Sequence, residues 1–298
     1  MLTKIMEEFK MKTNNLNANN MKYKNAGINN VDAGTKTGIM SKIFLLAALM
    51  LSLGFLFSQN ALAQPGGQEI MEKVYHNPSG DDVEGRLTMT LINRQGERRV
   101  RNLQQYTKDY GDVEKKIMFF LSPADVQGTS FMNWSYTDGS DDDQWIYLPA
   151  LKRIRRISSD GKGDYFMGSD FTYDDLGERH PDEDNHELTG EETIDGKECW
   201  VIESTPKDPD YMYSRTVTWV MKDNYIGLKR EFYDDRGRHL KTLTIKDYDQ
   251  INGFWTILET EMNNVQRDHT THMKFSDVKI NQGIPDRMFT ERNMMLGQ

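Results

Sequence analysis

The stretch Trp145–Ile157 reads WIYLPALKRIRRI, an aromatic and aliphatic half followed by a cationic half. Because proline cannot donate a ladder hydrogen bond, Pro149 predicts two short strands or one bent strand. The four cations that follow are Lys152, Arg153, Arg155 and Arg156. They fit an edge strand whose charges block further strand pairing. They fit equally well a set of cations that pair with buried acids or bind an anionic head group or a partner.

Alternating apolar residues, separated by short polar turns, flank this stretch on both sides. Between residues 86 and 278 they predict about eleven strands, and Asn252-Gly253 is a strong hairpin signal. Short turns between successive strands indicate one antiparallel meander, and the lack of long helical crossovers argues against a parallel α/β architecture. Short helices are expected at Gln68–Asn77 and Pro285–Met294.

Several of these strands are apolar on both faces, as in KKIMFFL (Lys115–Leu121) and TWVM (Thr218–Met221). A sheet with one solvated face would alternate more cleanly, so both faces need cover. A helix could cover one part, and the remainder could enclose an apolar ligand. The irregular, Gly-rich and acidic insertion Ser158–Asn185 is expected to be a lid or binding loop.

The front of the chain carries an export signal. Fifteen uncharged residues, Ile43–Phe57, follow Lys42 and precede Ala61-Leu62-Ala63, which predicts a secretory signal cleaved after Ala63. The run is shorter than the roughly 20 residues of a membrane span, although an uncleaved anchor is the alternative. We expect residues 1–39 to be an upstream extension or a mis-assigned start, 40–63 the signal peptide and 64–298 a single domain.

Charge and cysteine content indicate the class of partner and the cellular compartment. The first 63 residues hold seven of the 37 Lys and Arg and three of the 46 acids, so the mature chain has a net charge of −13. This argues against nucleic acid as a partner. Cys199 is the single cysteine, which precludes an internal disulfide and fits a bacterial periplasm.

Signatures of catalysis and metal binding are missing from the sequence. G-x-S-x-G, H-E-x-x-H, P-loop and C-x-x-C motifs are all absent. His269 and His272 stand three apart on an expected strand, so they face opposite sides and we expect both at a solvent edge. Ser169 and Asp170 are the one arrangement to test for hydrolysis, but a helix-capping role is favoured. We therefore predict no catalytic residue, metal or cofactor.

WIYLPALKRIRRI, followed by FMGSDF at Phe166–Phe171, resembles a family signature. The pattern W-x-Y-L-P, then K-R-x-x-R-I, then F-x-G-S-D-F is similar to that of outer-membrane lipoprotein-sorting proteins of the LolA-like superfamily. The resemblance is most specific here and extends more loosely over nearly all of the mature chain. It implies a mainly β (α+β) fold, in which a strongly curved antiparallel sheet forms an incomplete barrel and short helices cover its concave apolar face.

The resemblance also implies a function. It suggests a monomeric periplasmic carrier, not an enzyme, that moves acyl chains of lipids or lipoproteins towards the outer membrane, often beside an inner-membrane transporter. A lipid-acting, phospholipase-like hydrolase on the same scaffold and an accessory protein of a transporter remain open.

For a carrier, Phe166–Leu176 would be part of a lid or plug, with Phe171 and Tyr173 touching the cavity. Asp170 and Asp174 are candidate internal partners for the four cations. Core packing is the alternative for each candidate lining residue: Met89, Leu91, Phe119, Phe131, Trp134, Trp145, Tyr147, Leu148, Phe166 and Trp219.

Overall fold

The computed structural model describes residues 64–297, most of which belong to the compact unit Pro65–Gln298. The expected upstream segment 1–39, the signal peptide 40–63 and the cleavage site after Ala63 lie outside the described residues. No helix in the described part combines the length and apolar character needed to cross a membrane.

A single antiparallel sheet of thirteen strands dominates the described residues. The strands are β1 (Asp82–Ile92), β2 (Arg98–Asp109), β3 (Val113–Ser122), β4 (Ser130–Tyr136), β5 (Asp143–Leu148), β6 (Arg153–Arg156), β7 (Asp184–Ile194), β8 (Lys197–Pro206), β9 (Arg215–Met221), β10 (Gly227–Tyr233), β11 (His239–Ile251), β12 (Phe254–Asn264) and β13 (His269–Ile280). The predicted meander is confirmed, but the predicted count of about eleven is too low. At Pro149 the chain reverses through the 3₁₀ turn η1 (Pro149–Leu151), so the flanking segments are two paired strands.

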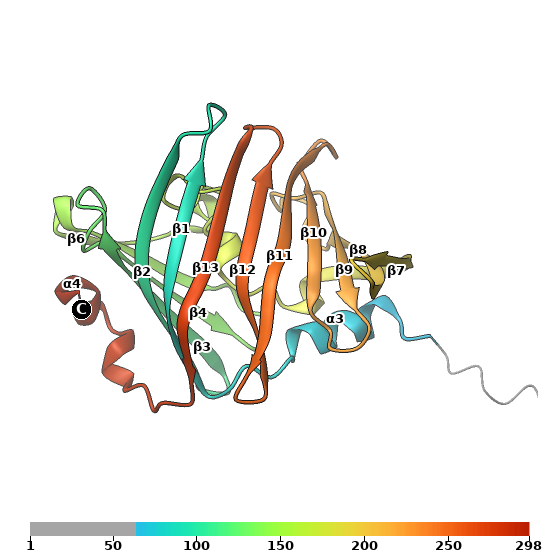
Figure 1. The fold of residues 1–298 in the computed structure, drawn as a ribbon, viewed down its shortest axis with the longest axis horizontal. Helices are drawn as coiled ribbons and strands as arrows, with labels where there is room; N and C mark the ends of the chain where they lie inside the picture. Colours follow the sequence, from blue (N-terminus) through green and yellow to red (C-terminus); the bar gives the residue numbers. More distant parts are fainter. Residues whose placement is uncertain (1–63, 298) are drawn as a thin grey trace, which may run out of the picture. The chain divides into compact units, whose positions relative to one another are not determined.

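The strand order places the two halves of the chain side by side in one sheet. β1 pairs with β13 at the centre, β6 and β7 are the two edges, and every other neighbour is consecutive in sequence. In Figure 1 the sheet curls, with β3, β4 and β6 bending behind on one side and β8 and β7 on the other. The two edges do not pair with each other, so the predicted incomplete barrel is confirmed.

Helices are few and short, and they cover different faces. The apolar side of α3 (Gly67–Tyr75), with Ile70 and Met71, packs on β8 and β9 on the inner, concave face. The C-terminal η6 (Asp286–Phe289) and α4 (Glu291–Leu296) cover the outer, convex face of β3 and β4. Ser130 there donates a hydrogen bond to the Met294 carbonyl at 3.0 Å.

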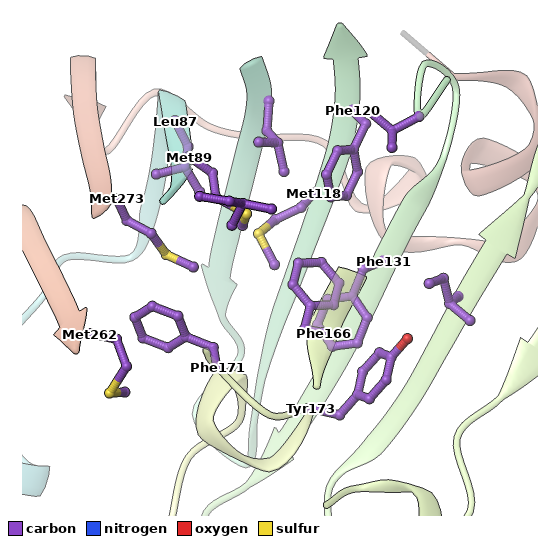
Figure 2. Close-up of a cluster of buried hydrophobic side chains, with 14 of the residues drawn as sticks. Leu87, Met89, Met118, Phe120, Phe131, Phe166, Phe171, Tyr173, Met262 and Met273 are labelled. Carbon is purple, nitrogen blue, oxygen red and sulfur yellow. The ribbon is translucent and has the colours of Figure 1, made fainter. Parts of the chain in front are cut away.

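The connection between the two edge strands runs through the inside of the sheet. It contains the 3₁₀ turns η2 (Ser159–Gly161), η3 (Phe166–Gly168), η4 (Asp174–Leu176) and η5 (Pro181–Glu183). Its aromatic side chains meet inward-facing residues of both halves, including Met89, Phe131 and Met262 (Figure 2). The concave face is therefore apolar where it meets this insertion, whose aromatic side chains cover that part of it.

Candidate functional site

Residues 166–176, which we call the plug segment, form a tight loop on the concave face. The Phe166 amide donates to the Phe171 carbonyl at 2.7 Å, and Tyr165 bridges to Thr172. Met167 and Gly168 both have positive φ, 50° and 76°, so the turn uses the conformation that glycine adopts without strain. The FMGSDF sequence thereby turns back on itself within six residues and presents its aromatic side chains to the sheet.

The aromatic side chains of the plug segment pack as one group. Phe166 lies 5.2 Å from Phe131 and 5.6 Å from Tyr173 between ring centroids, in tilted and edge-on arrangements. Phe171 points towards Met262 and Met273 of β12 and β13 (Figure 2). All three aromatic side chains of the plug segment are buried, so apolar burial of each stabilises the packing of this segment on the sheet by about 1.5–3 kcal/mol.

Asp170 fastens the plug segment to β13. Its fully buried carboxylate accepts a hydrogen bond from the Thr271 hydroxyl at 2.7 Å and lies 2.6 Å from Nδ1 of His269. The Asp170 amide donates to the Thr271 hydroxyl at 2.9 Å. The helix-capping prediction for Asp170 is therefore wrong, because its side chain reaches across to the sheet. The prediction that His269 lies at a solvent edge is also wrong, since only 15% of its side chain is exposed.

The side chain of Ser169 does not cap a helix either. Ser169 follows the last residue of η3, and both hydrogen bonds of its fully buried hydroxyl are with the Phe171 backbone. Within the described residues no general base contacts this hydroxyl, so the arrangement does not resemble an activated nucleophile.

A buried ion pair makes the second attachment. Lys241 of β11 is fully buried, and its ammonium donates to the Asp170 carbonyl at 3.1 Å and pairs with the Asp175 carboxylate. Asp175 also accepts a hydrogen bond from the Tyr213 hydroxyl at 2.9 Å. Burial raises the pKa of Tyr213 well above its ordinary value, so this phenol stays a donor. Removing one member of such a pair leaves an uncompensated buried charge, which is strongly destabilising.

The candidate lining residues divide between the two faces of the sheet. The concave cluster contains or contacts Met89, Leu91, Phe131, Leu148, Phe166, Phe171 and Tyr173. The convex clusters contain or contact Phe119, Trp134, Trp145, Tyr147 and Trp219. For the latter five, the assignment to a concave cavity is wrong, because alternate residues of a strand point to opposite faces.

The four cations lie on or beside the edge strand β6. Arg156 pairs with Asp143 of β5, and Lys152, Arg153 and Arg155 are exposed and make no ion pair with a described residue. Asp170 and Asp174 have other partners, so the suggested pairing of these acids with the cations is wrong. The arrangement supports the interpretation of an edge strand protected by charge.

A cavity of about 290 Å³ lies on the concave face, beside the plug segment. Its walls come from α3, the plug segment, residues 177–181 after it and the inner faces of β7 to β12. Phe171 lines it, whereas Tyr173 is buried in the core beyond. Two arginines line it, Arg179 and Arg230. Sequence reasoning missed Arg230 of β10, because Lys229 and Glu231 beside it are typical of a solvated strand.

Glu178, just beyond the plug segment, borders this cavity and two neighbouring hollows of about 600 and 360 Å³. Desolvation, followed by the nearby carboxylate of Glu114, raises the pKa of Glu178 to about 7. Desolvation similarly raises the pKa of Asp174, which accepts a hydrogen bond from Tyr211 at 2.5 Å. The concave interior therefore combines the apolar side chains around the plug aromatics with a group of ionisable residues that begins in the plug segment itself, at Asp170, Asp174 and Asp175.

Comparisons with known proteins agree with this architecture. A family profile described as an uncharacterized protein matches residues 112–295. None of the curated proteins matches the chain. A LolA superfamily protein from Nitrosomonas europaea, 21% identical over 77% of this chain and 99% of its own, shares the fold with a TM-score of 0.61.

Two solved structures are similar enough to define the family. A DUF1329 family protein from Desulfovibrio piger is 32% identical over 76% of this chain and 97% of its own, with a TM-score of 0.73. A protein from Vibrio parahaemolyticus, described as an outer membrane lipoprotein-sorting protein domain, is 35% identical over 77% of this chain and 98% of its own, with a TM-score of 0.72. This chain therefore belongs to the outer membrane lipoprotein-sorting protein family and has its LolA-like fold.

Proposed function

We propose that residues 64–298 form a single periplasmic carrier domain, which holds acyl chains of a lipid or lipoprotein on its concave face and delivers them towards the outer membrane. The observation that carries this proposal is the plug segment. Its aromatic side chains occupy an apolar concave surface, yet it belongs to a connection between unpaired sheet edges and can leave without breaking the ladder. An acyl chain would take its place.

The magnitudes favour exchangeable binding. Withdrawing three plug aromatics from apolar contact would cost about 5–9 kcal/mol, at about 1.5–3 kcal/mol for each. An acyl chain of about twelve methylenes would recover about 10 kcal/mol, at about 0.8 kcal/mol for each. These apolar terms are of similar size, so an acyl chain could replace the aromatic side chains without a chemical step, while release of the buried Asp170 and Lys241–Asp175 attachments adds to the cost of moving the plug segment. An inner-membrane transporter could be the donor, and the proposal requires no oligomer.

Native mass spectrometry of the protein purified from the periplasm tests carriage. We expect intact lipid or acylated peptide to copurify, and delipidated protein to rebind it. Release of lysolipid by clean protein, abolished by Ser169→Ala, would instead support the hydrolase alternative. Hydrogen exchange tests the role of the plug: amides of residues 166–176 should exchange faster when oleate is bound. Unchanged protection of these amides in the loaded protein would contradict displacement of the plug.

A further inference from the structure

Arg230 is one of the two arginines that line the 290 Å³ cavity, and it makes no ion pair with a described residue. It lies on the concave face of β10, opposite Thr218 and Leu243 of the neighbouring strands. Its Nε donates to the Thr218 hydroxyl at 3.0 Å, and its guanidinium makes no ion pair with any described residue. The two terminal nitrogens of the guanidinium group, which we call the fork, therefore have no hydrogen-bond partner among the described residues.

The acids around Arg230 are already engaged with other groups. Asp184 accepts two hydrogen bonds from Arg179, at 2.9 and 2.6 Å, and Asp175 pairs with Lys241. His186 contacts the Ser204 hydroxyl and the Pro181 carbonyl through its two ring nitrogens, and burial lowers its pKa, which favours the neutral ring. The carboxylates of Asp184 and Asp175 favour the charge of Arg230 from a distance, but neither makes a direct ion pair with its guanidinium.

The rest of the cavity wall makes this position amphipathic. Phe171, Phe232, Leu243 and Met262 line the cavity beside Arg230. Phe171, Phe232 and Met262 also belong to the concave core, so the apolar wall continues directly under the plug segment. Desolvation lowers the pKa of Arg230, although a guanidinium remains charged even when buried. A half-buried charge of this kind is costly unless a partner satisfies it.

We infer that Arg230 binds the oxyanion head group, carboxylate or phosphate, of the acyl ligand. Two parallel hydrogen bonds from the guanidinium match the geometry of either group. The chain would then run from Arg230 along Leu243 and Met262 towards the space that the plug segment occupies. This inference rests on the proposed carrier function and adds to it the chemical class of the ligand, an anionic amphiphile.

The test compares matched probes on delipidated protein by calorimetry. The probes are oleate, oleyl phosphate, oleyl alcohol and inorganic phosphate. The variants are Arg230→Met, which removes the fork, Arg230→Lys, which keeps the charge, and Lys229→Met as the control. Lys229 is one residue away on the opposite face, where it pairs with Glu231, so this control removes the same charge outside the cavity.

We expect the wild type to bind oleate and oleyl phosphate about 10- to 100-fold more tightly than oleyl alcohol. Arg230→Met should abolish this preference and leave alcohol binding intact, whereas Lys229→Met should keep it. If Arg230→Met does not fold, Arg230→Lys should still reduce the preference several-fold. Equal wild-type affinity for acid and alcohol, or a preference that survives Arg230→Met, would overturn the inference and leave carriage standing.

Two further outcomes separate the possible failures. Inorganic phosphate that binds as tightly as oleyl phosphate would indicate a site for small anions and would overturn the assignment of an acyl ligand. A wild-type protein that binds none of the three oleyl probes would contradict the proposed carrier function itself.

Discussion

Replacing Asp170 with alanine should loosen the plug segment before it unfolds the sheet. The carboxylate interacts with Thr271 at 2.7 Å and with His269 at 2.6 Å, and it is fully buried. Each hydrogen bond to a charged group contributes about 1.5–3 kcal/mol, and loss of one partner of a buried pair typically costs about 3–5 kcal/mol. We expect Asp170→Ala to lower the free energy of unfolding in urea by about 3–5 kcal/mol.

Asp170→Asn should cost less, about 1–3 kcal/mol, because an amide oxygen still accepts from Thr271. Asp160→Asn is the matched control, since this exposed acid of the same connection makes no ion pair with a described residue, and it should stay within about 0.5 kcal/mol of wild type. Native-state hydrogen exchange of Asp170→Asn should accelerate in residues 166–176 more than in β1 or β13. A loss below about 1 kcal/mol for Asp170→Ala, or uniform acceleration across the sheet, would refute the assignment of Asp170 as the attachment.

Three other changes test separate parts of the structure. Desolvation, followed by the carboxylate of Glu114, raises the pKa of Glu178 from 4.5 to about 7, so the folded state loses stability as pH rises through this interval. Glu178→Gln should therefore raise the thermal midpoint of unfolding at pH 8 but not at pH 4. Equal shifts at the two pH values would contradict this. Phe289→Ala should cost about 3–5 kcal/mol in urea unfolding, since this side chain is only 2% exposed under the convex face; a negligible loss would show that the C-terminal cover is dispensable. Cys199 is fully buried, and burial raises the pKa of its thiol, so a disulfide reagent at pH 8 should label it only after unfolding. Rapid labelling of the folded protein would contradict the burial of Cys199.

The strands could be read from the sequence because their signals are local. Asn252 and Gly253 both have positive φ, 53° and 88°, and they join β11 to β12 as the hairpin signal predicts. The edge position of β6 was one interpretation of its cations, and the pairing of β6 with β5 alone confirms that position. Binding of an anionic head group or a partner by the exposed cations stays a prediction.

The sequence does not predict in the same way which residues of each strand point to the concave face. In β3, Phe119 and Phe120 are adjacent and equally apolar, yet Phe119 lies under the C-terminal helices and Phe120 faces the plug. Period-two alternation tells which residues share a face, but with both faces apolar it does not tell which face is concave. Arg230 was missed for a related reason, although its two-residue offset from the inward Phe232 carries the signal.

The unpaired edges β6 and β7 have a mechanical consequence. In a closed barrel, strand number and shear fix the diameter, so a wider interior requires the breaking of ladder hydrogen bonds. Here the seam between the edges contains no ladder, and side chains of a single connection fill the interior. No ladder hydrogen bond across the seam therefore fixes the curvature of the sheet, and the side chains packed on the concave face support it. An open sheet of this kind can change its curvature while every strand keeps its hydrogen-bonded neighbours.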